Sequence, residues 1–359
     1  MAFTVPNVNI IFNLDNTNDI KIFIVSMKKL ISICFLLLTF IACKKPDPIE
    51  IINTDLTGRI YKDTTLTADR EWILDGRVSI MPGYTLTIEP GTIIKAKGGT
   101  GANSTCLIIT NGAKINAVGT ANDPIIFTSI LENTSPESRG LWGGLLILGS
   151  AKGSFSGEVE QLQIEGIPAN DEVGLYGGTN DHYNAGTLSY VSIRHGGSDI
   201  GEGNEINGLT LACLGDCTTI NNIEVMSNAD DGVELFGGTV NVENVLVWAC
   251  ADDFIDIDQG YSGTINNLLL IPDYVSDHVI EVDGGEGSYN PNFTITNCNM
   301  LDTIFWPAYV HFRDGASGYL SYQGDCDFHC EQGVNVLVDN ITSINNENDF
   351  NWTNYSLYY

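Results

Sequence analysis

After residue 58, short apolar runs alternate with glycine, asparagine and aspartate, and no stretch keeps the spacing of three and four residues that an amphipathic helix requires. The runs are rich in β-branched residues, which favours strands. Three of them, at 233–236, 255–258 and 280–283, share one alternating pattern at offsets of 22 and 25 residues, and 310–313 fits the same slot. The pattern predicts an all-β fold made of repeated short strands.

An asparagine follows an apolar residue by two positions in four of these repeats. The four are Asn222, Asn244, Asn267 and Asn297. Repeats of about 20–30 residues with one inward apolar column are typical of a parallel β-solenoid, in which successive coils stack about 4.8 Å apart. Asparagine tolerates a left-handed bend, and its amide can bond to the amide of the next coil. We therefore expect these asparagines to belong to the scaffold.

Several stretches resemble a known family. They are 83–92 (GYTLTIEPGT), 107–129 (LIITNGAKINAVGTANDPIIFTS), 140–149 (GLWGGLLILG), 186–197 (GTLSYVSIRHGG), 204–211 (NEINGLTL) and 230–239 (DDGVELFGGT). Through them the chain resembles exported right-handed parallel β-helix proteins of Bacteroidetes-type bacteria. The resemblance implies a single-stranded, right-handed parallel β-helix over residues 58–350, but no particular reaction. Many members carry a C-terminal domain for type IX secretion; we see none, and expect 351–359 to be a tail or a truncated cap.

The N-terminal segment predicts export. Met27-Lys28-Lys29 precede an apolar run, 30–41, that is too short to span a bilayer and is typical of a secretory signal. Phe40-Ile41-Ala42-Cys43 resembles a bacterial lipobox, which implies cleavage before Cys43 and acylation of that residue. The alternative is an ordinary signal peptide with an incidental cysteine.

These features divide the N-terminal segment into three parts. We interpret 1–26 as an upstream extension, 27–43 as the signal peptide and 44–57 as a tether. The predicted location is the cell envelope, as an outer-membrane lipoprotein, with the membrane face that the body occupies left open.

The charge of the chain is strongly negative and unevenly distributed. There are 45 acidic against 16 basic residues, a net charge of −29, and 153–359 contains 32 acids but only two bases, Arg194 and Arg313. A chain this acidic has no electrostatic attraction to phosphate backbones, which excludes a nucleic-acid partner. The hydrophobic content of 43% still allows a large core. The partner of the acidic region is expected to be cationic, neutral or bridged by metal ions.

The alternating pattern places a set of carboxylates together on the outer face. Like charges one coil apart repel by roughly 1 kcal/mol in water and by more where they are shielded from it. Bound cations would relieve this repulsion, and oxygen donors favour Ca²⁺. The predicted ligands are Asp230, Glu234, Asp256, Asp258, Glu281 and Asp283. The alternatives are relief by His311 and Arg313, or a solvated acidic face without a site.

A catalytic interpretation is the alternative for the same region. Asp231, Asp252, Asp253 and His278 resemble the site of polygalacturonase-type β-helix glycosidases, in which stacked aspartates act as acid and base. The Gly-His-Gly motif and the basic substrate clamp of those enzymes are missing, and a Ca²⁺-dependent lyase would have only Arg194 or Arg313 as a base. The main prediction is therefore a binding or structural module for a glycan or a cell-surface protein. A polysaccharide hydrolase or lyase is the alternative.

Two further sets of residues complete the sequence-based predictions. In the loop 175–184, Tyr176, His182 and Tyr183 are candidates for stacking on neutral sugars, unless the loop is only structural. In an exported protein the cysteine pairs four residues apart are disulfide candidates. These pairs are Cys213 with Cys217 and Cys326 with Cys330. A zinc site of Cys326, His329 and Cys330 is an alternative that lacks a clear fourth ligand.

Overall fold

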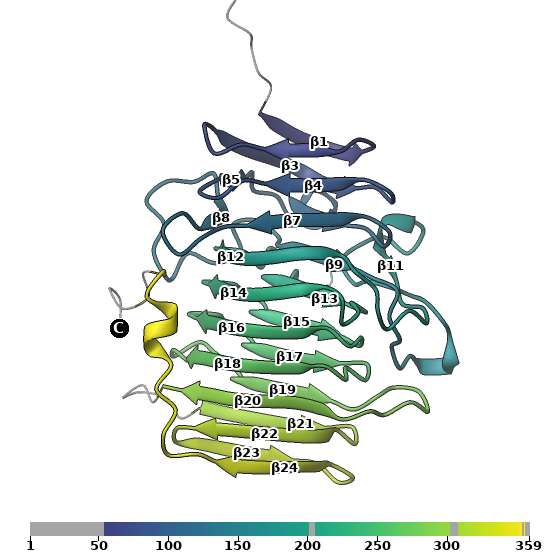
Figure 1. Cartoon of the computed structure of the whole chain (residues 1–359), viewed down its shortest axis with the longest axis vertical. Helices are drawn as coiled ribbons and strands as arrows, with labels where there is room; N and C mark the ends of the chain where they lie inside the picture. The colour runs from purple at the N-terminus through teal and green to yellow at the C-terminus, as the bar shows by residue number, and fades with distance from the viewer. Residues whose placement is uncertain (1–53, 201–204, 302–307, 354, 356–359) are drawn as a thin grey trace, which may run out of the picture. The chain divides into compact units, whose positions relative to one another are not determined.

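The described part of the chain is a stack of coils. The computed structural model describes residues 54–200, 205–301, 308–353 and 355. Strands pair in parallel with strands of the neighbouring coils, apart from one small antiparallel pair (Figure 1). This arrangement confirms the predicted right-handed parallel β-helix. None of the helices in the described residues is long and apolar enough to cross a membrane.

One row of short strands runs along the stack. It consists of β6 (Cys106–Ile109), β9 (Leu145–Leu148), β13 (Leu209–Ala212), β15 (Val233–Phe236), β17 (Ile255–Asp258), β19 (Ile280–Asp283), β21 (Ala308–Arg313) and β23 (Cys326–Cys330). Each strand of this row pairs in parallel with the next. The row carries the candidate site on its outward side.

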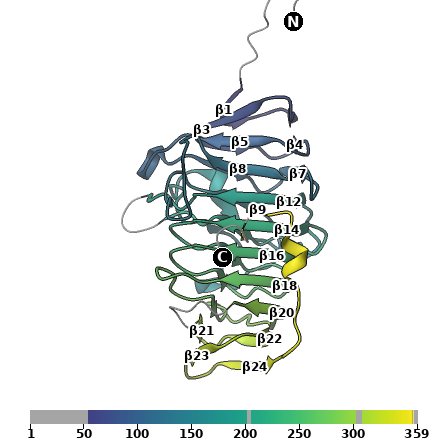
Figure 2. The same cartoon turned by 90° about the vertical axis from the view of Figure 1, so that its left-hand side faces the viewer.

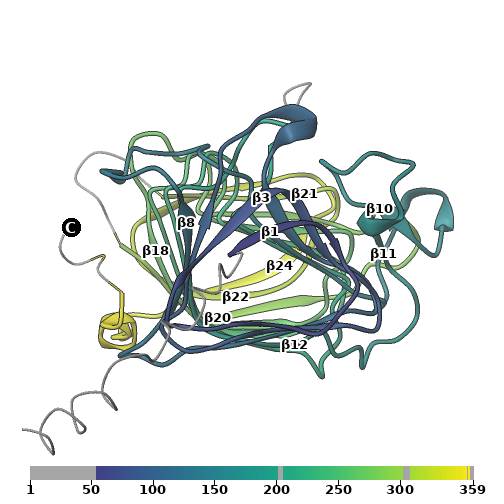
Figure 3. The same ribbon diagram turned by 90° about the horizontal axis from the view of Figure 1, so that it is seen from above.

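Longer strands form the rest of each coil. They are β12 (Gly186–Arg194), β14 (Thr219–Met226), β16 (Asn241–Trp248), β18 (Thr264–Ile271), β20 (Phe293–Met300), β22 (Ser317–Gln323) and β24 (Asn335–Asn340). The first coils contain β1 (Asp55–Ile60), β2 (Thr64–Leu66), β3 (Glu71–Ile80), β4 (Thr85–Ile88), β5 (Ile93–Ala96), η1 (Gly101–Asn103), β7 (Lys114–Val118) and β8 (Ile125–Ser129). Figure 3 looks along the stack and shows the coils around a common interior.

The predicted register is confirmed in the row of short strands. Val233 pairs with Ile255, and Ile280 pairs with Val310, so the offsets of 22 and 30 residues each correspond to one coil. The inward residues of β15, β17 and β19, such as Leu235, are at most 1% exposed. Burial of a side chain of this size contributes about 1.5–3 kcal/mol, so the stacked apolar column accounts for much of the stability of each coil.

The asparagine column is confirmed as scaffold. Asn222, Asn244 and Asn267 have φ values of 53°, 57° and 64°, in the left-handed region that asparagine tolerates better than most residues. The Asn244 Nδ2 donates to Asn222 Oδ1 at 3.2 Å, and the Asn267 Nδ2 donates to Asn244 Oδ1 at 2.6 Å. The side chains therefore continue the coil-to-coil bonding at the bend.

The connection between β9 and β12 forms a small structure of its own. It contains η2 (Ser156–Glu158), β10 (Leu162–Gln163), η3 (Glu172–Gly174) and β11 (Leu175–Tyr176). Its buried Phe155 and Tyr176 pack with Leu146 and Phe236 on the outward side of the row of short strands. The connection therefore covers this row at β9 to β15, and it also contacts the segments that follow β17 and β19 through Gln259, Glu286 and Ser288.

After β24 the chain turns back along the flank of the stack (Figure 2). The segment includes η4 (Glu347–Phe350). Phe350 and Tyr355 are buried, and they pack with Leu246 and Trp248 of β16. The described part of the C-terminal segment therefore lies against the side of the coils.

Candidate functional site

The outward side of the row of short strands carries a column of polar residues on consecutive coils. Glu234 pairs with Asp256, Asp256 with Glu281, Glu281 with His311, and His311 with His329. We call these five residues the acidic column, although its last two members are histidines. The structure thus brings three predicted metal ligands into direct register.

A second column runs beside it. This second column consists of Phe236, Asp258, Asp283 and Arg313 on consecutive coils. Asp258 is paired with Phe236, and Asp283 is paired with Arg313. The Arg313 guanidinium contacts both oxygens of Asp283, one of them from Nη2 at 2.9 Å. Its Nη1 lies 3.3 Å from Glu281 Oε2. Arg313 therefore neutralises the later carboxylates but leaves Glu234 and Asp256 without a basic neighbour in the register of the column.

The carboxyl groups of these columns have raised pKa values. Burial, followed by the neighbouring carboxylates, raises the pKa of Asp258 to about 7 and that of Asp256 well above its usual range. Burial does the same for Glu234, which is 5% exposed and accepts a hydrogen bond from the Asn207 amide. The alternative of a solvated acidic face without a site therefore does not hold for Glu234, because the connection between β9 and β12 packs on the strand that carries it. Near neutral pH these groups retain protons or require a cation.

The four catalytic candidates lie in the turns next to the columns. The Asp253 amide donates to Asp231 Oδ1 at 3.0 Å, and the His278 amide donates to Asp253 Oδ1 at 2.8 Å. The His278 Nδ1 lies 2.9 Å from the same Asp253 oxygen, which raises the pKa of His278. Asp231 and Asp253 are 8% and 5% exposed. Their carboxylates therefore tie one turn to the next and are only slightly accessible to a substrate.

Asp252 is the accessible member of this group. Burial, with the negative charge of Asp253 and Asp277, raises its pKa to about 6. Asp230 is partly buried, and burial together with neighbouring acids raises its pKa to about 7. Oxygens of Asp230, Asp231 and Asp252 lie within 4.8 Å of one another. Inverting glycosidases separate their two carboxyl groups by about 6.5–9.5 Å to admit a water molecule, so this spacing suits a shared proton or cation better.

The aromatic loop prediction is wrong for Tyr176. Its side chain is 1% exposed, and its hydroxyl donates to Gln259 Oε1 at 2.7 Å. Tyr183 is partly buried, and its hydroxyl accepts from the Gly112 amide at 2.7 Å. His182 is exposed and pairs with Asp216. The three side chains therefore do not form a common sugar-stacking surface.

The predicted disulfides are not formed, since all seven described cysteines are free. Cys213 is buried and Cys217 is exposed, so the two side chains lie in different environments. Cys326 and Cys330 stand at the two ends of β23, where an extended strand separates them by about 13 Å, too far for a disulfide. The alternation of that strand also turns His329 away from both cysteines, which excludes the zinc set of these three residues. The lipidation candidate Cys43 lies outside the described residues.

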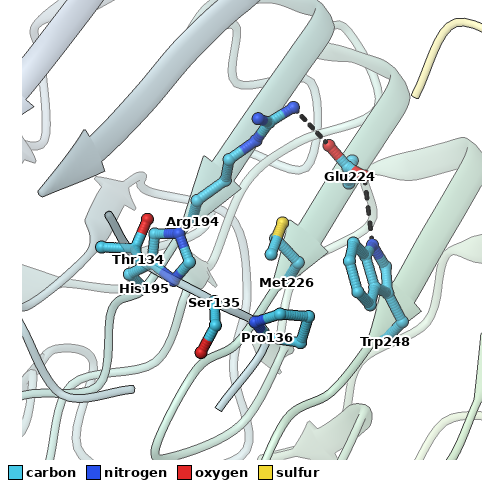
Figure 4. A pocket seen from close by; sticks show the side chains of 8 residues that line it. All are labelled: Thr134, Ser135, Pro136, Arg194, His195, Glu224, Met226 and Trp248. Atoms are coloured by element: carbon cyan, nitrogen blue, oxygen red, sulfur yellow. Dashed lines mark hydrogen bonds and ion pairs between the residues drawn. The ribbon is translucent and has the colours of Figure 1, made fainter. Parts of the chain in front are cut away.

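The sequence did not predict a buried charge cluster on another side of the coils. Figure 4 shows Arg194 and Trp248 reaching Glu224 from opposite sides. The Glu224 side chain is 1% exposed and also accepts a hydrogen bond from Ser192. The adjoining cavity has a volume of about 110 Å³. With three donors on one carboxylate, the cluster is suited to holding successive coils together.

The fold and the geometry define a class of protein: a parallel β-helix that stacks carboxylates on consecutive coils of one face. Residues 58–306 match the family of pectate-lyase-like β-helix domains. The chain therefore belongs to this family. Searches of curated proteins and of solved structures found no match to the chain.

Proposed function

We propose that this chain is an exported binding module whose acidic face holds Ca²⁺ and, through it, a glycan or a cell-surface protein. The observation that carries the proposal is the register of Glu234, Asp256 and Glu281 on three consecutive coils. Three carboxylates at this spacing repel one another, and a divalent cation between them converts the repulsion into attraction.

The residues present fit a calcium ion. The Oδ1 of Asp256 is buried and has no hydrogen-bond partner, although it lies in the middle of the column. Asp258 supplies a further oxygen donor from the neighbouring column, whereas both oxygens of Asp283 are bonded to Arg313. Ca²⁺ takes six to eight oxygen ligands, so a partner's hydroxyl or carboxylate groups would complete its shell. Bound Ca²⁺ supplies positive charge to an otherwise negative face, which allows an acidic glycan to approach.

Polysaccharide hydrolysis or elimination is the second candidate function. It is favoured by the family and by Asp252, an accessible carboxyl group with a pKa of about 6, which suits a general acid near neutral pH. The hydrogen bonds of Asp231 and Asp253 to backbone amides oppose it, because they commit these carboxylates to the turns. We therefore rank binding above catalysis.

The test is a calcium titration of the metal-free protein, followed by calorimetry and thermal melting. We expect Ca²⁺ to raise the melting temperature of the wild type, since a ligand that binds only the folded state stabilises it. The double variant Asp256→Asn/Asp258→Asn should lose this response. Glu243→Gln should keep it, because Glu243 is paired with Asn221 and Asn266 and has no acidic neighbour in register. A melting temperature that ignores both Ca²⁺ and EDTA would reject the proposal.

The enzyme candidate is tested with the same protein. It is incubated with a panel of plant and algal polysaccharides, with and without EDTA. New reducing ends would indicate a hydrolase, and unsaturated uronates would indicate a lyase; either result would displace the binding module as the main function.

We further propose that the chain is anchored to the outer membrane through Cys43.

A further inference from the structure

The chemistry of the acidic column changes towards its C-terminal end. Three of the five histidines of the chain, His278, His311 and His329, lie there on consecutive coils. The ring centroids of His278 and His311 are 5.2 Å apart, and those of His311 and His329 are 4.8 Å apart. Imidazoles bind first-row transition metals, whereas Ca²⁺ prefers oxygen donors.

The two ring nitrogens of His311 have different surroundings. Its Nδ1 lies 3.0 Å from Glu281 Oε1. A carboxylate can only accept, so Nδ1 carries the proton, and in the neutral ring Nε2 is left with a free lone pair. This Nε2 is buried and has no hydrogen-bond partner. An unpaired buried acceptor is costly, which indicates that a ligand completes the site.

The next coil supplies matching donors. Glu331 Oε1 lies 3.7 Å from His311 Nε2. One donor atom each from His311, His329 and Glu331 lies within 4.8 Å of the others. Two imidazoles and one carboxylate form the protein ligands of several kinds of catalytic metal site.

Glu281 contacts Nδ1 of His311, the ring nitrogen opposite the proposed metal ligand. Its Oε2 lies 3.3 Å from Arg313 Nη1, which leaves Oε1 directed at His311 Nδ1. A carboxylate that holds the outer nitrogen of a ligating histidine fixes the tautomer and the direction of the ring. Glu281 is therefore a positioning residue.

We propose that His311 Nε2, His329 and Glu331 bind one divalent transition-metal ion of the zinc class, with Glu281 orienting His311. None of the three zinc ligands belongs to the proposed calcium site. The two arrangements have Glu281 in common, as the residue that orients His311 and as the last carboxylate in register with Asp256. The two sites share one face, so a transition metal and Ca²⁺ would occupy it side by side.

The test is a Zn²⁺ titration by calorimetry of the full chain in a large excess of Ca²⁺, which saturates the oxygen-only sites. We expect one zinc ion per chain. His329→Gln and Glu331→Gln should each weaken it by at least 100-fold; both side chains are exposed near the end of the stack, so the fold should survive. Glu281→Gln should weaken it by about 10–100-fold, as is usual for the partner of a ligating histidine.

The controls address the competing cluster of His182, Asp216 and Cys217, all of which are exposed. His182→Gln should leave zinc binding unchanged. Co²⁺ in place of Zn²⁺ should give a visible spectrum without a thiolate charge-transfer band. Absence of zinc uptake, loss of uptake in His182→Gln, a thiolate band, or unchanged affinity in His329→Gln would each overturn the proposal.

Discussion

Replacing Asp256 by asparagine should stabilise the metal-free protein at alkaline pH. Asp256 stands between Glu234 and Glu281 in register, about one coil spacing from each. At 4.8 Å, each pair of unit charges repels by about 0.9 kcal/mol in bulk water and by about 3.5 kcal/mol at an effective dielectric constant of 20. Because relaxation and proton uptake reduce this, we expect a gain of about 1–3 kcal/mol, and Tm should rise by at least about 2 °C.

The gain should depend on pH. Burial and neighbouring carboxylates raise the pKa of Asp256 well above that of an unfolded aspartate. A raised carboxyl pKa contributes stability that is complete below the unfolded pKa, near 4, and is lost as the pH rises through the folded pKa. Asp258, with a pKa of about 7, acts in the same direction. The wild type should therefore be less stable at pH 8 than at pH 5, and Asp256→Asn should reduce that difference.

The assay is thermal melting in EDTA at pH 5 and pH 8, with circular dichroism and fluorescence compared to check for a single transition. Glu243→Gln is the matched control, since it removes an exposed carboxylate between neutral partners, and its Tm should change little. The reasoning fails if Asp256→Asn melts at or below the wild-type temperature at pH 8. It fails equally if the gain is the same at both pH values.

Two further predictions concern the scaffold and the anchor. Asn244→Ala should lower the free energy of unfolding, measured by urea titration, by about 2–3 kcal/mol, because it removes the amide hydrogen bonds to Asn222 and Asn267 and places alanine at a φ of 57°. Asn244→Gly should recover the part of the loss that comes from the backbone conformation. An Asn244→Ala variant as stable as the wild type would contradict this prediction. Cys43→Ser should abolish incorporation of a lipid precursor while Cys34→Ser does not, and continued labelling of Cys43→Ser would refute the anchor.

The repeat of the sequence was sufficient to predict the coils, because the side-chain period of a strand is two and parallel coils place like residues above one another. The offset between Val233 and Ile255 therefore gave the register, and the register gave the neighbours of Asp256. The asparagine bends followed from the same offsets, since only a few residue types occupy a left-handed position readily.

Contacts between a long connection and the coils could not be predicted in this way, because no period relates them. Tyr176 is an example, since its burial depends on where the connection folds back. One signal was present: the run 145–148 is apolar at every position, which is typical of a strand covered on both faces. The Glu224 cluster was not predicted for a similar reason, because its partners Arg194 and Trp248 come from different coils. In a chain with so many acidic residues, the sequence does not show which one is buried.

The physical constraint that builds the coils also argues for ions on the acidic face. A solenoid places equivalent positions above one another. An outward carboxylate on each of three coils therefore costs about 1–3 kcal/mol of repulsion per neighbouring pair, and the fold itself does not require carboxylates at these positions. Arg313 relieves this cost at Asp283 and Glu281, and His311 also contacts Glu281. Asp256 receives no such relief in the register of its column, and its Oδ1 is buried without a partner. The face therefore changes along the stack, from carboxylates that either retain a proton or bind a hard cation to imidazoles that suit a softer one.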